Sequence, residues 1–130
     1  LRKYVSKNNL VLIDGAHNVL GAQVVKKYLN TFSAKRKIFM VLGMMANKEH
    51  KKFIEIFKNQ VQSISTLNIP NQENFVEKEK LSKIVKSSGI PSKTENSIRS
   101  AFKNIAKENA NAIIFCTGSL YLAGEILNLN

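Results

Sequence analysis

The chain of 130 residues is long enough for one domain with a core of ordinary size, and we expect residues 1–130 to form a single domain. Apolar residues make up 44% of it, with only 6 glycines and 2 prolines, which excludes an intrinsically disordered chain. Lysine and arginine outnumber aspartate and glutamate by 20 to 9, so the formal net charge of +11 leaves an anionic partner open.

Short apolar runs alternate along the chain with stretches in which apolar residues recur every three or four positions. In chain order, this pattern predicts a strand over 11–13, a helix over 20–32, a strand over 38–42, a helix over 53–61, a strand over 63–69, a helix over 81–85, a strand over 92–95, a helix over 98–106, a strand over 112–116 and a helix over 120–127. The first of these helices carries an apolar stripe made of Leu20, Val24, Val25, Tyr28, Leu29 and Phe32.

The alternation of buried strands and amphipathic helices predicts the α/β fold class. We expect a three-layer Rossmann-like sandwich, in which a mainly parallel sheet has helices on both faces. Ligands of such sheets bind beyond the carboxyl ends of the strands, so the loops after the first, second and last strands are the candidate functional segments. Asp14, Gly43 and Gly118 should therefore lie at one edge of the sheet.

The loop after the first strand carries three polar side chains, Asp14, His17 and Asn18. A carboxylate at a strand end can accept hydrogen bonds from ribose hydroxyls, and the start of the next helix favours anions. These residues are therefore candidates for a nucleotide or anion site. The alternative is that Asp14 or Asn18 only caps the following helix.

Two further loops offer groups to the same crevice. In the loop after the second strand, Asn47 is expected to cap a helix with Glu49 in its first turn, and Lys48 either binds a substrate carboxylate or faces solvent. After the last strand, Gly118 and Ser119 can present backbone N–H groups and a hydroxyl to an anion. Ser119 can equally act as a plain N-cap.

The lysines are spread over the polar faces of the expected helices, and no aromatic residues interleave with them as stacking platforms for bases would require. This pattern favours solvated helix faces and predicts no nucleic-acid partner. Two other classes stay open: a basic nucleic-acid-binding domain, and a free-standing nucleotide- or anion-binding module. Strong salt dependence of affinity for DNA or RNA would support the first of them.

The cellular compartment is indicated by what the sequence contains and lacks. The single cysteine, Cys116, stands in an apolar run and cannot form an internal disulfide, which favours a reduced compartment. No apolar run approaches the roughly 18 residues of a membrane span, and no signal peptide is visible. We therefore expect a cytoplasmic protein without a membrane partner.

A family resemblance rests on the three loops together. The first reads Asp14-Gly15-Ala16-His17-Asn18 and resembles the Asp-Gly-Ala-His-Asn-Pro signature of the folylpolyglutamate synthase / dihydrofolate synthase family, within the Mur ligase superfamily. The segment 43–49 is similar to the Gly-Met-x-x-Asp-Lys-Asp segment of that family, and 118–122 to its closing Gly-Ser-Leu-Tyr motif. There are departures: Val19 replaces the proline, and Asn47 and Glu49 replace the two aspartates.

The resemblance covers nearly the whole chain and implies a Mur ligase C-terminal domain that is one part of a longer enzyme. The family's N-terminal ATPase domain carries the phosphate-binding loop and the Mg²⁺ ligands. No Gly-x-x-x-x-Gly-Lys-Ser/Thr motif occurs in the 130 residues. The implied expectation is that ATP and Mg²⁺ are bound mainly by that other domain, that no metal ligands lie in this chain, and that the chain alone is inactive.

The resemblance also implies a reaction and roles for five residues. ATP phosphorylates a carboxylate of dihydropteroate or a folate, and the amine of L-glutamate attacks the acyl phosphate. Asp14 would hold the ATP ribose, while His17, the catalytic candidate, and Asn18 would lie near the terminal phosphate and the incoming glutamate. Lys48 and Ser119 would bind glutamate carboxylates. Members of the family are usually monomers, so a monomer is expected.

Overall fold

The computed structural model describes residues 2–32 and 36–129 as a single five-stranded sheet with helices on both sides. The strands are β1 (Leu10–Ile13), β2 (Ile38–Leu42), β3 (Ser63–Thr66), β4 (Ser92–Thr94) and β5 (Ile113–Thr117). The helices are the 3₁₀ turn η1 (Arg2–Tyr4), α1 (Val19–Leu29), α2 (His50–Glu55), α3 (Lys78–Ser87), α4 (Ile98–Glu108) and α5 (Leu120–Leu127). The strand order is β1-β5-β2-β3-β4, and every pairing is parallel.

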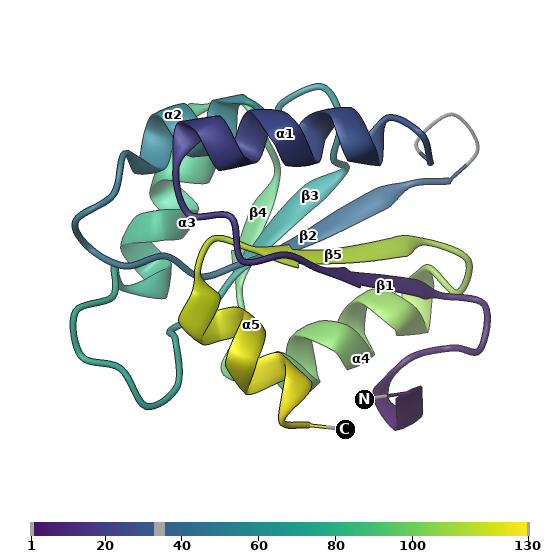
Figure 1. The fold of residues 1–130 in the computed structure, drawn as a ribbon. Coiled ribbons are helices and arrows are strands. Elements are labelled where there is room, and N and C mark those ends of the chain that lie inside the picture. Colours follow the sequence, from purple (N-terminus) through teal and green to yellow (C-terminus); the bar gives the residue numbers. More distant parts are fainter. Residues whose placement is uncertain (1, 33–35, 130) are drawn as a thin grey trace.

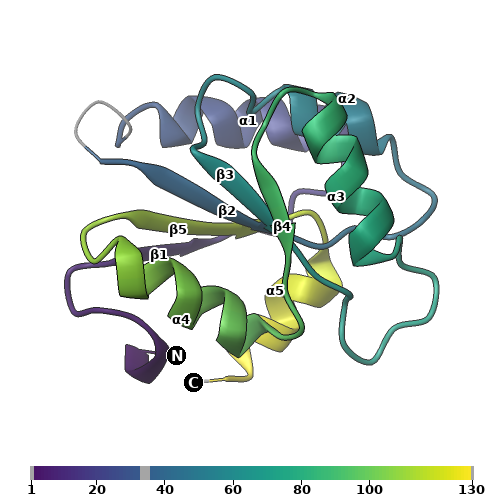
Figure 2. The same ribbon diagram turned by 180° about the vertical axis from the view of Figure 1, so that it is seen from behind.

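The sheet lies between two helical layers, as the alternating pattern predicts. Figures 1 and 2 show α1, α2 and α3 on one face and α4 and α5 on the other. Successive residues of the interior strand β5 face the two helical layers in turn: Ile113 and Phe115 pack in the core beneath α1–α3, and Ile114 and Cys116 pack in the core beneath α4 and α5. This alternation follows from the two-residue period of a strand, and it confirms the three-layer α/β fold.

Several helix ends differ from the sequence expectation, most clearly in α1 and in α2, which was expected over 53–61 and ends at Glu55. Helix α2 begins at His50, and Glu49 occupies the N-cap position without a side-chain hydrogen bond. Asn47 lies in the preceding turn, so the prediction that Asn47 caps this helix with Glu49 in its first turn is wrong. Helix α1 ends at Leu29, and Phe32 lies in the turn that follows.

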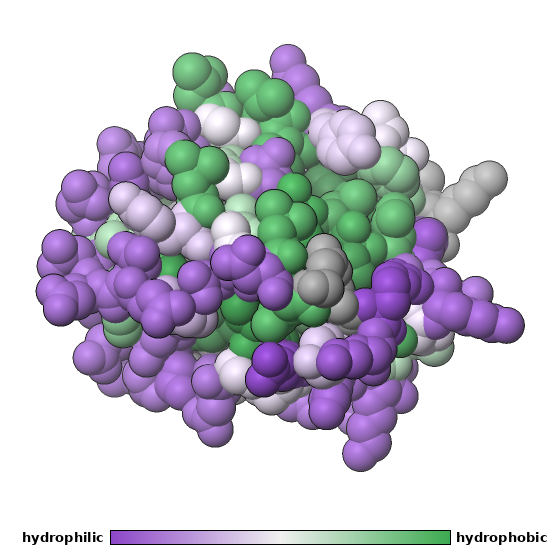
Figure 3. All heavy atoms as spheres, turned by 60° about the horizontal axis from the view of Figure 1, so that its bottom comes forward, coloured by the Kyte–Doolittle hydropathy of each residue, from purple (hydrophilic) through white to green (hydrophobic). Residues whose placement is uncertain are grey.

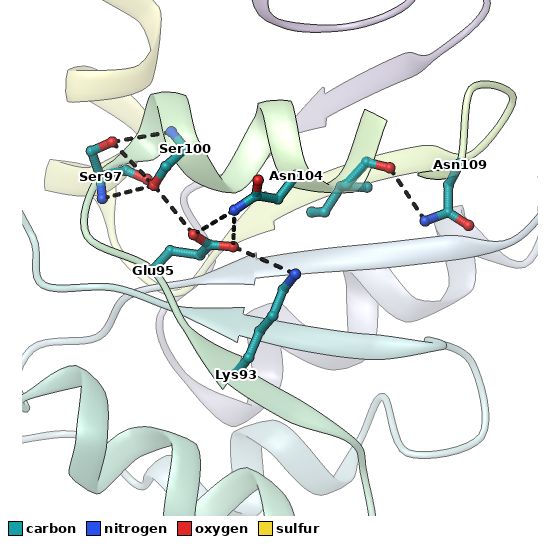
Figure 4. A network of polar contacts seen from close by, with 7 residues as sticks. Lys93, Glu95, Ser97, Ser100, Asn104 and Asn109 are labelled. Atoms are coloured by element: carbon teal, nitrogen blue, oxygen red, sulfur yellow. Dashed lines mark hydrogen bonds and ion pairs between the residues drawn. The ribbon is translucent and has the colours of Figure 1, made fainter. Parts of the chain in front are cut away.

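The buried carboxylate of Glu95, which follows β4, is hydrogen-bonded to side chains of α4 (Figure 4). Its side chain is 7% exposed. It accepts hydrogen bonds from Asn104 Nδ2, at 3.1 Å to each carboxylate oxygen, and from Ser100 Oγ at 3.2 Å, while Lys93 Nζ lies 3.7 Å away. A buried charge is costly unless it is paired and hydrogen-bonded, so these partners allow a carboxylate to sit at this junction.

The loops after β1, β2 and β5 meet at Gly118. Its backbone N–H donates to Ala16 O at 3.0 Å, and Gly43 N donates to Thr117 O at 3.4 Å. Gly118 has φ +111°, and a Cβ at this position would collide with Gly43 O and lie 2.8 Å from a methyl carbon of Leu42. Only glycine combines this backbone conformation with so close an approach.

Replacing Gly118 with alanine should therefore destabilise the domain. We expect Gly118→Ala to lower the free energy of unfolding in urea by at least about 1–3 kcal/mol, the usual cost of a strained backbone conformation. The matched control is Gly124→Ala, because Gly124 lies inside α5 and a Cβ there would have nothing within 4 Å. That control should gain about 0.5–1 kcal/mol. Equal effects of the two substitutions would contradict the steric account.

The Glu95 junction gives a second expectation for stability. Asn104→Ala removes the amide that bonds both carboxylate oxygens, and it should lower the free energy of unfolding by about 1–3 kcal/mol. Lys107→Ala serves as the control, since Lys107 is an exposed residue of the same helix. A loss no larger than that of the control, measured in the same urea titration, would show that the network does not stabilise the fold.

Candidate functional site

A pocket of about 420 Å³ lies where the loops after β1, β2 and β5 come together. Its lining is formed by His17, Met45, Asn47, Lys48, Ser119, Leu120 and Tyr121. The strand ends Ile13, Cys116, Leu42 and Thr117 are aligned across the sheet, so Asp14, Gly43 and Gly118 leave the same edge. The pocket therefore lies beyond the carboxyl ends of the strands, where the sequence predicts the site.

His17 contributes an imidazole whose two nitrogens have different roles. Nδ1 lies 3.1 Å from Gly15 O, and a carbonyl oxygen can only accept, so Nδ1 carries the hydrogen of this contact. In the neutral ring, Nε2 is then the nitrogen that can accept a hydrogen bond or a proton. The contact with Gly15 thus fixes the tautomer that a proton acceptor in the pocket would need.

Lys48 contributes a cation without a protein partner. The residue is half-buried in the pocket wall, and among residues 2–32 and 36–129 its ammonium group has no carboxylate within ion-pair distance. The neighbouring Glu49 pairs with Lys52 instead, at 3.2 Å. Among the residues that the structure describes, no carboxylate lines the pocket. A lysine and an imidazole that line a pocket without carboxylates suit an anionic ligand.

Ser119 is an N-cap that also lines the pocket. It is 2% exposed and is the N-cap of α5, where its Oγ accepts from Tyr121 N at 3.0 Å and from Leu122 N at 3.4 Å. Because both backbone groups donate to Oγ, the hydroxyl hydrogen stays available for donation to a ligand.

Asp14 and Asn18 lie outside the pocket lining, and both are exposed. Asn18 Oδ1 accepts from Gly21 N at 2.8 Å, which makes Asn18 the N-cap of α1. Asp14 Oδ1 accepts from Ala16 N at 2.8 Å within its own loop. Capping is therefore confirmed for Asn18 and does not apply to Asp14. The structure brings His17, Lys48 and Ser119 together and leaves these two residues at the edge beside them.

Four lining residues were not among the site residues predicted from the sequence: Met45, Asn47, Leu120 and Tyr121. Leu120 and Tyr121 open α5 and are 65% and 54% exposed. Periodicity alone cannot separate such residues from core residues of the same helix. Leu120 also lies directly over Gly15, where any Cβ would meet its side chain, so this leucine joins α5 to the first loop.

The remaining chemistry-bearing groups do not extend the site. Cys116 is buried in β5, and burial raises the pKa of its thiol far above the ordinary value, which keeps it protonated and unreactive. Within the described ranges, no three His, Cys, Asp or Glu side chains gather into a group that could hold a metal ion. No described helix is long and apolar enough to cross a membrane.

Comparison with known proteins supports the resemblance seen in the three loops. The family model for the dihydrofolate synthetase C-terminal domain matches residues 1–129. None of the curated proteins searched matches the chain. Solved structures match it well, among them a Mycobacterium tuberculosis folylpolyglutamate synthase complexed with ADP and AMPPCP, with a TM-score of 0.81 and 22% identity over 92% of this chain.

Two further structures agree. E. coli FolC in complex with DHPP and ADP has a TM-score of 0.77 at 17% identity over 92% of this chain, and the bifunctional folylpolyglutamate synthase/dihydrofolate synthase of Yersinia pestis CO92 has 0.77 at 15% over 96%. At such identities the structures establish the fold. The chain spans 28–29% of the length of the three. The match of the family model over 129 residues shows more: the chain belongs to the dihydrofolate synthetase C-terminal domain family.

Proposed function

We propose that this chain is the C-terminal domain of an ATP-dependent ligase that adds L-glutamate to dihydropteroate, to folates or to both. One observation carries the proposal: His17, Lys48 and Ser119, from three loops far apart in sequence, line a single pocket without acidic groups. Family membership and the nucleotide complexes of the similar solved structures support it. Glutamate brings two carboxylates, and a pocket lined by a lysine and by no described carboxylate suits them.

The proposed reaction overcomes the low reactivity of a carboxylate. Transfer of the terminal phosphoryl group of ATP to a substrate carboxylate gives an acyl phosphate and ADP. The glutamate amine then attacks the acyl carbon; a C–N bond forms, the C–O bond to phosphate breaks, and phosphate leaves with its electron pair. The nitrogen must lose a proton, and we assign its uptake to Nε2 of His17, the free acceptor of that ring.

The other residues would position the reactants. Lys48 and Ser119 would bind glutamate carboxylates, through the ammonium group and the hydroxyl hydrogen that the N-cap bonds leave free. Asp14 would accept from the ATP ribose with its second oxygen, and Asn18 would lie near the terminal phosphate with its amide N–H₂ group. Both lie at the same sheet edge as the pocket, although neither is in its wall.

The phosphate-binding loop and the Mg²⁺ ligands are assigned to a second, N-terminal domain of a longer parent chain. The 130 residues contain no such loop, and the described residues contain no group of side chains that could hold a metal ion. No residue of this chain is therefore assigned to Mg²⁺. Phosphoryl transfer depends on backbone amides, a lysine and Mg²⁺ around the phosphates. We further propose a cytoplasmic monomer that has no nucleic-acid partner.

Glutamate affinity tests the role of Ser119. In the full-length enzyme, Ser119→Ala should raise the KM for glutamate about 10- to 150-fold, which corresponds to roughly 1.5–3 kcal/mol for a hydrogen bond to a charged group, with a smaller effect on the KM for ATP. Ser97→Ala is the matched control, since Ser97 caps α4 in the same way and lies outside the pocket lining. Unchanged glutamate kinetics, or an equal effect of the control, would remove Ser119 from the site.

The 130-residue chain by itself should not catalyse the reaction, and it should bind ATP only with about millimolar affinity, on the order of −4 kcal/mol. Half of a cleft lacks the buried contacts and the closure that exclude water. Calorimetry with ATP and with inorganic triphosphate, at low and at moderate salt, measures this affinity. Micromolar ATP binding that survives salt and discriminates against triphosphate would instead support a free-standing nucleotide-binding module.

A further inference from the structure

Helix α1 exposes a row of large apolar side chains that the core does not use. Leu20, Val24 and Tyr28 are 72%, 63% and 55% exposed, and their spacing of four residues places them on one face of the helix. The buried residues of α1 are Ala22, Val25 and Leu29. The apolar stripe expected from the sequence is therefore divided between the core and an outer surface, which we call the α1 ridge and define as Leu20, Val24 and Tyr28.

Other apolar side chains outside the α1 ridge are also exposed or only partly buried. Strand β1 is an edge strand of four aliphatic residues, each only partly buried, and Leu120 and Leu127 of α5 are 65% and 56% exposed. Figure 3 shows hydrophobic side chains gathered in the middle of the face it presents, with polar side chains around them. Monomeric soluble proteins rarely expose large contiguous apolar patches without a binding partner.

The α1 ridge adjoins a groove that carries positive charge. The groove has a volume of about 530 Å³, and Leu20 and Val24 line it together with Lys26, Lys27 and Glu55. Neither lysine has a carboxylate partner in the described part of the chain. A complementary surface would therefore combine apolar side chains with acidic residues at its rim.

The ridge also lies close to the candidate site. Leu120 lines the pocket and packs over Gly15, in the loop that leads into α1, and Leu20 belongs to the first turn of that helix. A body that covers the ridge and Leu120 would also close one side of the pocket. The solved structures with this fold are more than three times as long as the chain. Another domain of the same polypeptide could therefore cover the ridge.

We infer that the α1 ridge is the docking surface for the N-terminal domain of the parent ligase, through an apolar patch of that domain with acidic residues around it. The inference rests on the proposed function, because that function supplies the second domain. Docking at the ridge places the partner beside Leu120, so the same contact that buries Val24 also completes the wall of the pocket.

Chemical labelling of the full-length enzyme tests the interface directly. Cysteine introduced as Val24→Cys should react with a maleimide at least tenfold more slowly than cysteine introduced as Lys83→Cys, an exposed position on α3. Both substitutions fall on exposed side chains, so the fold should tolerate them. Cys116 should not react with the maleimide, because it is buried and the pKa of its thiol is raised. Peptide mass spectrometry identifies the labelled cysteine in both variants.

Three outcomes would overturn the inference or support it. Equal labelling rates at the two positions would show that the ridge faces solvent in the full-length enzyme. Protection of Val24→Cys that disappears on dilution would show that a second copy, and not the N-terminal domain, covers the ridge. Protection that is independent of protein concentration supports the inference. The assay needs neither ATP nor glutamate, so an enzyme that is protected but does not ligate glutamate would refute the proposed function alone.

Discussion

The site depends on the contact between three loops at Gly118. Parallel strands deliver their carboxyl ends to one edge, but the pocket forms only because the loops then touch: Gly118 N–H bonds to Ala16 O, and Gly43 N–H bonds to Thr117 O. The glycine at 118 allows the positive φ and the approach to Gly43 O that this contact requires. Backbone geometry at one residue therefore sets the distances between side chains that come from three different strands.

The same side chains serve local folding and the candidate chemistry. Ser119 caps α5, Asn18 caps α1, and the contact of His17 with Gly15 O holds the imidazole in one tautomer. A cap uses only the acceptor side of a hydroxyl or an amide, so the donor side remains for a ligand. For Ser119, the role as a cap therefore does not exclude a role in binding. The two hydrogen bonds of the cap hold Ser119 Oγ in place at the pocket wall.

The fold and the position of the candidate pocket could be predicted from the sequence because β1, β2 and β5 are mostly apolar runs, and the loops that follow them are easily recognised. The prediction failed where the deciding contact is tertiary. Asn47 was expected to cap a helix, yet the chain turns once more and α2 begins only at His50. The stripe on α1 gave the correct helix but could not show that Leu20 and Val24 face outward, because periodicity records apolar positions and not what covers them.

Charge connects the pocket to the exposed ridge. The chain carries a net +11, and among the described residues only two ion pairs form, so most of its cations are not neutralised by the domain itself. In the pocket, the described residues supply no carboxylate, so Lys48 is free for an anion. Along α1, Lys26 and Lys27 form no ion pair with the described residues, although Glu55 lines the same groove. A ligand in the pocket and the proposed second domain at the α1 ridge would therefore both meet lysines that have no carboxylate partner. Acidic residues at the rim of the proposed second domain would pair with Lys26 and Lys27 and leave the charge of Lys48 for the substrate, because the pocket and the groove beside α1 are separate cavities.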